Sequence, residues 1–131
     1  MESESLMPGP IQNQIGAVFV PVSDLARSVQ WYSKLFGLPV KTTSHDGTIY
    51  DLQMVGDVAL ILDANKPVVS HSPQPLCFFW TEDIRSARSF LQASSIPILS
   101  AIEDIGSVSF VTFADPDGNL LMVCQRNTRD E

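Results

Sequence analysis

The stretch FADPDGNLLMVCQ, residues Phe113–Gln125, joins a polar turn to a run of apolar residues. Pro116 presets the backbone angle φ for a turn, and Gly118 can take the left-handed conformation before the next strand. Asp115 and Asp117 are adequately explained by the chemistry of the turn. The stretch therefore predicts a hairpin whose last strand carries no acid, base or hydroxyl over residues 120–124.

The second half of the chain, which contains this hairpin, predicts a strand, a helix and three further strands. The expected elements are a strand at 76–81, a helix at 84–95 capped by Asp83, and strands at 96–104, 106–115 and 118–125. The first half of the chain predicts the same order. Its expected elements are a strand at 15–22, a helix that Ser23 or Asp24 can cap and Gly37 ends, and strands at 38–46, 47–56 and 57–63.

The two halves keep nearly the same register. Asp24 maps to Asp83 and Gly47 maps to Gly106, each 59 residues further along the chain. The sequence therefore predicts one βαβββ unit repeated twice in an α+β fold. The expected domain is 14–126, made of repeat one (14–63), a Pro- and Ser-rich linker (64–75) and repeat two (76–126). Residues 1–13 and 127–131 are expected to be tails.

Composition and net charge restrict the kinds of molecule that the protein is expected to bind. The chain has 131 residues and a net charge of −7, so its field disfavours nucleic acid and anionic membranes. No apolar run reaches membrane-spanning length and no signal peptide is visible, which predicts a cytoplasmic protein. Cys77 and Cys124 lie in apolar runs without a CxxC partner and are expected to be buried free thiols.

Three features together resemble the vicinal oxygen chelate superfamily, which includes glyoxalase I, bleomycin resistance proteins and extradiol dioxygenases. These are VSDLARSVQWYSKLFGLPV near the start, FADPDGNLLMV near the end, and the repeat itself. The resemblance covers about residues 14–126. It implies that both repeats curl a mixed sheet into a cup around a central cleft. Many members place metal ligands, such as His or Glu, on the first and last strand of each half.

The resemblance implies that the metal-ligand positions of the superfamily correspond to Ala17, Leu76, Met122 and Ile61 in this sequence. If the register differs by one residue, Leu60 takes the place of Ile61. None is a usual ligand for the divalent metals of the family, since three lack a donor atom and Met offers only a thioether. His45 and His71 are expected in a turn and in the linker, exposed to solvent. We therefore expect no metal and no cofactor.

Strand alternation predicts what lines the cleft instead. The expected lining is apolar and aromatic: Ala17, Phe19, Ile61, Leu76, Phe78, Trp80 and Met122. Tyr50, Asp51 and the indole N–H of Trp80 are its expected polar groups. Such a surface suits a flat apolar or cationic molecule, because aromatic faces attract planar and positively charged groups.

Other interpretations stay open at this point. The same residues can simply fill the interior as core. A metal-dependent lyase, isomerase or dioxygenase would need ligands that this register misses. A third possibility is a dimeric scaffold module without a ligand. The preferred hypothesis is a metal-free protein that binds a small apolar or aromatic molecule, and the resemblance implies a homodimer.

Overall fold

The computed structural model describes residues 9–41, 47–65 and 74–127, which form two helices and seven strands. The strands are β1 (Ala17–Pro21), β2 (Ile49–Leu52), β3 (Ala59–Asp63), β4 (Phe78–Trp80), β5 (Glu103–Asp104), β6 (Val108–Ala114) and β7 (Leu120–Arg126). The helices are α1 (Leu25–Phe36) and α2 (Ile84–Ala93). These elements confirm the predicted α+β class.

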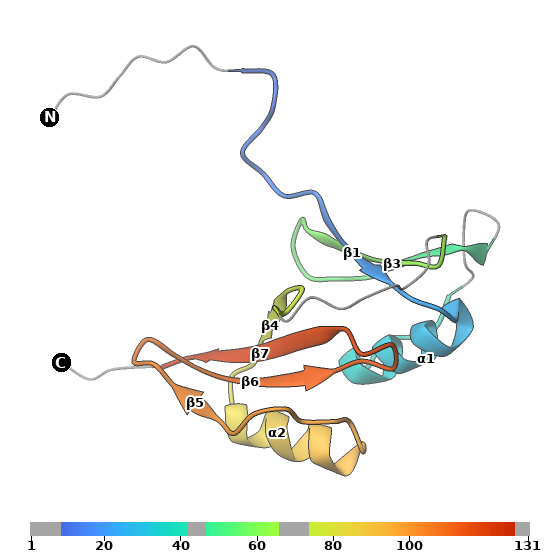
Figure 1. Ribbon diagram of the computed structural model, residues 1–131. Coiled ribbons are helices and arrows are strands. Elements are labelled where there is room, and N and C mark those ends of the chain that lie inside the picture. The colour runs from blue at the N-terminus through green and yellow to red at the C-terminus, as the bar shows by residue number, and fades with distance from the viewer. Residues whose placement is uncertain (1–8, 42–46, 66–73, 128–131) are drawn as a thin grey trace, which may run out of the picture.

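Each half of the chain contributes one mixed sheet (Figure 1). The strand order is β1-β3-β2 in the first sheet and β4-β7-β6-β5 in the second. In both sheets the strand before the helix pairs in parallel with the last strand of its half, β1 with β3 and β4 with β7. This shared topology is what a repeated unit requires, and it confirms the repeat predicted from the sequence.

The two helices begin in the same way. Asp24 accepts a hydrogen bond from the backbone N–H of Arg27, and Asp83 accepts one from that of Ser86. These caps satisfy donors that the first turn of a helix leaves unpaired. At the other end of α1, Gly37 has φ +68°, a left-handed conformation that costs glycine little. The predicted caps and helix end are therefore confirmed.

Two predicted strands differ from the structure. Residues 38–41 form no strand, and the remainder of the strand predicted at 38–46 lies outside the described residues. Pro39 has no N–H, and the N–H of Lys41 donates to the hydroxyl of Tyr50 at 3.0 Å. In the strand predicted at 96–104, only β5 and an isolated bridge between Ile98 and Phe113 form.

One hydrophobic core joins the two halves. Helix α1 packs against β2 and β3, and α2 packs against β6 and β7. We call the helix-covered faces of both sheets the closed side and their opposite faces the open side. Buried residues of the closed side come from both halves: Val20, Leu60, Leu62, Val111, Phe113, Leu121 and Val123.

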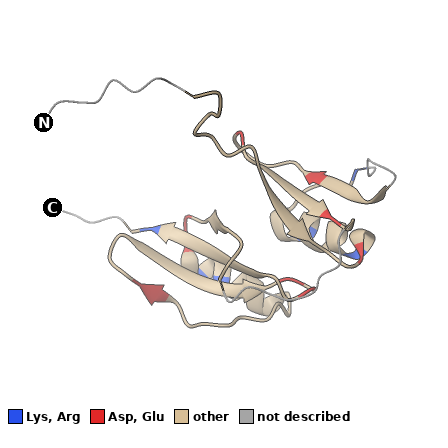
Figure 2. Cartoon of the chain, turned by 45° about the horizontal axis from the view of Figure 1, so that its top comes forward, with Lys and Arg blue, Asp and Glu red and all other residues tan. Residues whose placement is uncertain are grey.

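Charged residues lie mainly on helices, turns and strand ends, and strand β5 is acidic throughout (Figure 2). This leaves most strand centres free to bury apolar side chains. Neither described helix is long and apolar enough to cross a membrane.

Candidate functional site

The open side carries the seven residues predicted to line a cleft. Ala17, Phe19 and Ile61 lie on the first sheet, where Phe19 pairs in register with Ile61. Phe78, Trp80 and Met122 lie on the second sheet, where Phe78 pairs with Met122, and Leu76 continues the alternation of β4. The structure therefore places all seven on the predicted faces, but divides them between two sheets.

Four of these side chains are largely accessible to solvent in the single chain. The exposed fraction is 57% for Phe19, 47% for Phe78, 48% for Trp80 and 37% for Leu76. Fully buried core residues of the same type, such as Phe113, have 1% or less. These four residues therefore do not fill the interior of one chain, and the interpretation of them as core is wrong.

The aromatic residues of β4 contact one another. The rings of Phe78 and Trp80 meet edge to face with centroids 5.0 Å apart. The guanidinium carbon of Arg126, from β7, lies 3.8 Å from the ring centroid of Trp80. Edge-to-face and cation–π geometries of this kind are favourable, so they hold the indole in place.

The positions where the resemblance would put metal ligands offer no chelating set. Ile61 lies on the open side and Leu60 is buried on the closed side, so Ile61 is the equivalent position. Ala17 and Ile61 belong to one sheet, and Leu76 and Met122 to the other. Their side chains do not fit a divalent metal, because hydrocarbon groups and one thioether replace the imidazole and carboxylate ligands such metals prefer.

Other side chains do not rebuild a metal site in the residues the structure describes. No three His, Cys, Asp or Glu side chains of ranges 9–41, 47–65 and 74–127 group together as a metal requires. Asp63 accepts a hydrogen bond from the backbone N–H of Asn65 at 2.8 Å and is a single carboxylate. His45 and His71 lie outside the described residues.

The prediction that Tyr50 offers a polar group to the cleft is wrong. Tyr50 pairs with Leu62 and is buried on the closed side, while its neighbour Asp51 pairs with Ile61 and is exposed. Successive residues of a strand point to opposite faces, so the two could not both line the same surface. Asp51 remains as a polar group of the open side.

The two cysteines do not suit nucleophilic chemistry. Both thiols are free. Cys77 packs against the core. Cys124 is buried, and it pairs with Trp80 on the neighbouring strand β4 and with Phe110 on the neighbouring strand β6. Burial raises the pKa of Cys77 to about 11 and also raises the pKa of Cys124. The reactive thiolate is therefore disfavoured at neutral pH.

The carboxylate of Asp115 connects the two halves, a role that the sequence did not reveal. It accepts hydrogen bonds from the hydroxyl of Tyr32 at 2.6 Å and from the side-chain amide of Asn119 at 2.9 Å. The same amide donates to the backbone oxygen of Pro21 at 2.9 Å. Burial, and then the charge of Asp115, raises the pKa of Tyr32 far above its ordinary value. The turn at 115–119 thus holds α1 and β1 against the second half.

Asp117 adds a second connection across the same boundary. It accepts hydrogen bonds from the backbone N–H and the hydroxyl of Ser23, and lies 3.6 Å from the guanidinium of Arg27. Turn chemistry explains the backbone of this segment, but its carboxylates also bind residues more than 80 positions away. No local pattern could have signalled those partners.

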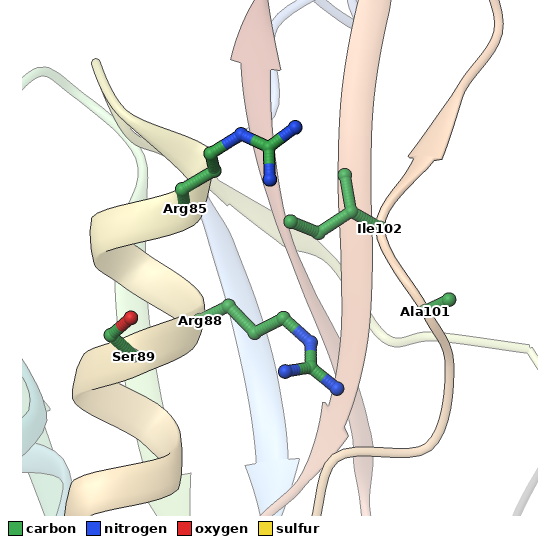
Figure 3. A pocket seen from close by; sticks show the side chains of 5 residues that line it. All are labelled: Arg85, Arg88, Ser89, Ala101 and Ile102. Atoms are coloured by element: carbon green, nitrogen blue, oxygen red, sulfur yellow. The ribbon is translucent and has the colours of Figure 1, made fainter.

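Three hollows lie in the described part of the chain, and Trp80 of the open side lines the second of them. One of about 300 Å³ is lined by Arg85, Arg88 and Ser89 of α2 and by Ala101 and Ile102, with both arginine side chains extending from α2 toward the segment that carries Ala101 and Ile102 (Figure 3). A second, of about 160 Å³, is an apolar gap between α1 and α2. The third lies beside Trp31, which is half-buried. None of these three hollows is lined by residues from both open faces.

Comparison with known proteins identifies the fold. A family profile described as "Glyoxalase/Bleomycin resistance protein/Dioxygenase superfamily" matches residues 14–123. No curated protein sequence matches the chain.

Solved structures with similar folds carry varied descriptions. A glyoxalase/dioxygenase from Nostoc punctiforme matches with a TM-score of 0.73 at 15% identity, covering 97% of this chain and 100% of the other. TnmS3, an antibiotic binding protein from Streptomyces sp. CB03234, matches with 0.72 at 18% identity, covering 92% and 100%. Oxidase ChaP-H1 matches with 0.68 at 16% identity, covering 88% and 98%. At these identities the likeness concerns the fold alone.

Proposed function

The chain belongs to the glyoxalase/bleomycin resistance protein/dioxygenase superfamily, and we propose that it is a metal-free member that binds a small, planar, apolar or aromatic molecule. The observation that carries this proposal is the exposure of Phe78 and Trp80 beside Met122, on the face where related enzymes would hold a metal. Large aromatic residues exposed together commonly mark a binding surface. The ligand is held by stacking and burial, without chemistry on it.

The description of TnmS3 as an antibiotic binding protein supports this choice, because a chain of similar fold is said to bind a drug. The descriptions of other neighbours as oxidases keep the metal-dependent enzyme as the contrasting hypothesis. In our proposal the protein sequesters its ligand, and resistance to a toxic aromatic compound is the corresponding biological role.

A second copy of the chain completes the binding site in this proposal. In one chain the two open faces leave Phe19, Leu76, Phe78 and Trp80 exposed, so neither face covers the other. An apolar face of one copy set against an apolar face of a second copy would enclose the ligand between two walls. We expect sedimentation equilibrium to find a dimer; a monomer at micromolar concentration would contradict this arrangement.

Binding is tested with 2-naphthamide, a neutral planar probe, by titration calorimetry and thermal unfolding. A binder gains about 2.7 kcal/mol of stability at a ligand concentration 100 times its dissociation constant. We expect Trp80→Ala to weaken the probe by about tenfold, because an aromatic contact contributes about 0.5–1.5 kcal/mol beyond area burial. Trp31→Phe, at the other tryptophan, is the control and should leave affinity unchanged.

Metal analysis separates the proposal from its contrasting hypothesis. Protein purified without added metal or chelator should contain far less than one equivalent of zinc, manganese or iron. One equivalent of such a metal, retained through dialysis and held by side-chain donors, would overturn the metal-free proposal.

A further inference from the structure

We propose that Arg126 sets the charge preference of this site, so that the bound aromatic molecule carries an anionic group such as a carboxylate. The inference rests on the proposed function and adds the chemical class of the ligand. It also revises the expectation of a cationic ligand. Three observations support it: the position of Arg126 on the open side, its contact with Trp80, and the fact that no carboxylate of the described residues forms an ion pair with it.

Arg126 shares the open side with the aromatic residues. It lies two positions after Cys124 and four after Met122 in β7, and residues at even spacing along a strand point to the same face. Met122 and Cys124 pair with Phe78 and Trp80 of β4. The guanidinium thus lies at the end of the strip where the ligand is proposed to bind.

The contact with Trp80 leaves the N–H groups of the Arg126 guanidinium available for hydrogen bonds. Its carbon lies 3.8 Å from the indole centroid, close enough for the cation to contact the ring directly. In such a contact the cation is attracted to the π face of the indole, while the N–H groups of arginine point outward in a fixed, planar fork. That fork matches the two oxygens of a carboxylate, so the indole holds a donor group ready for an acid.

The charge of Arg126 is available to a ligand. Within the described residues the ion pair that forms joins Arg27 to Asp117 and does not involve Arg126. In that same part of the chain, no side-chain hydrogen bond involves Arg126 or the indole N–H of Trp80. A cationic ligand placed on Trp80 would meet this guanidinium at short range, where like charges repel.

The net charge of −7 acts in the opposite sense, since it attracts cations over longer distances. At physiological salt this attraction is screened beyond about 8 Å. Contacts at Trp80 are therefore governed by the guanidinium of Arg126, 3.8 Å from the ring centroid, whereas Asp51 of the open side belongs to the other sheet. The overall acidity does not set the preference at this position.

The test is calorimetry of the full-length protein with three probes that share one ring: 2-naphthoate, 2-naphthamide and 2-naphthylmethylammonium. We expect the anion to bind most tightly and the cation most weakly. Arg126→Gln should reduce 2-naphthoate affinity by about tenfold, the effect of losing a hydrogen bond between charged groups. It should weaken 2-naphthamide by less than it weakens 2-naphthoate, because the neutral probe loses only the support that Arg126 gives to the indole. It should strengthen binding of the cation.

Arg85→Gln is the matched control, because it removes the same charge from α2, away from the open side. It should change none of the three affinities by more than about twofold. Equal losses in both variants, or tightest binding of the cation by the wild type, would overturn the role of Arg126 while leaving the proposed function intact. Failure of all three probes to bind would instead overturn the proposed function, and the inference with it.

Discussion

The closed side and the open side of this protein are formed by the same strands and by similar residues, yet only one of them is core. Phe113 on the closed side is buried, whereas Phe19, Phe78 and Trp80 on the open side remain half exposed. Residue type does not separate these two groups. What separates them is the cover: helices pack on one face of each sheet and leave the other face free.

The closed side also carries the polar groups that join the two halves. Asp115, Tyr32 and Asn119 form a buried network there, and their partners lie in opposite halves of the chain. On the open side, the contacts described run within one sheet: Phe78 with Trp80, and Trp80 with Arg126. The closed side therefore maintains the fold, whereas the open-side contacts of the described residues do not link the two halves.

The largest expected effect comes from removing one phenylalanine from each side. Phe113→Ala should destabilise the protein by about 3–5 kcal/mol, because it leaves a cavity in a packed core. Phe19→Ala should cost only about 0.5 kcal/mol, since that side chain is already in contact with water. Urea unfolding of the two variants measures the difference, and similar losses would show that the open side is also core.

A smaller effect is expected from alkaline pH through Tyr32. Its folded-state pKa is raised above the ordinary value of 10.0 by burial and by Asp115, so the folded state keeps the proton that the unfolded state releases. The stabilisation is thus fully present below pH 10 and is lost as the pH rises further, by at most about 1.4 kcal/mol per pH unit.

Tyr32→Phe should be less stable at neutral pH but should lose this part of the alkaline slope. Cys77, whose pKa is raised to about 11, contributes to the slope in both proteins, so the difference between them isolates Tyr32. Urea unfolding between pH 8 and 11 provides the measurement. Parallel slopes in the two proteins would mean that the buried hydroxyl is not tied to the closed side as described.

The smallest expected effect is a gain in stability. Ser28 is fully buried on α1, and within the described part of the chain its hydroxyl has no hydrogen-bond partner. An unpaired buried polar group is unfavourable, and alanine is the better helix former, so Ser28→Ala should stabilise the protein by about 1 kcal/mol. Thermal unfolding checks this expectation. A lower melting temperature would reveal that the hydroxyl is satisfied, and that the closed side is more polar than it appears.

Local chemistry accounts for most of what could be predicted from the sequence. The caps Asp24 and Asp83, the helix end at Gly37 and the turn at Gly118 each depend on a few neighbouring residues, and all are confirmed. Alternation also indicated that Phe19, Phe78 and Met122 point away from the helices, each on the open side of its own sheet, because a strand has only two faces. Tyr50 is the exception: the same rule puts it on the closed side, because its neighbour Asp51 points to the open side.

The repeated unit, the two faces of each strand and the absence of donor atoms at Ala17, Ile61 and Leu76 follow from residue identity and short-range geometry, so they could be read from the sequence. Three features became known from the folded chain alone: which face of each sheet the helices cover, the hydrogen bond from Tyr32 to Asp115, and the contact of Arg126 with Trp80. Those contacts join residues far apart in the chain, and no local pattern records them: the first depends on how the two halves pack, and the second on the pairing of β4 with β7.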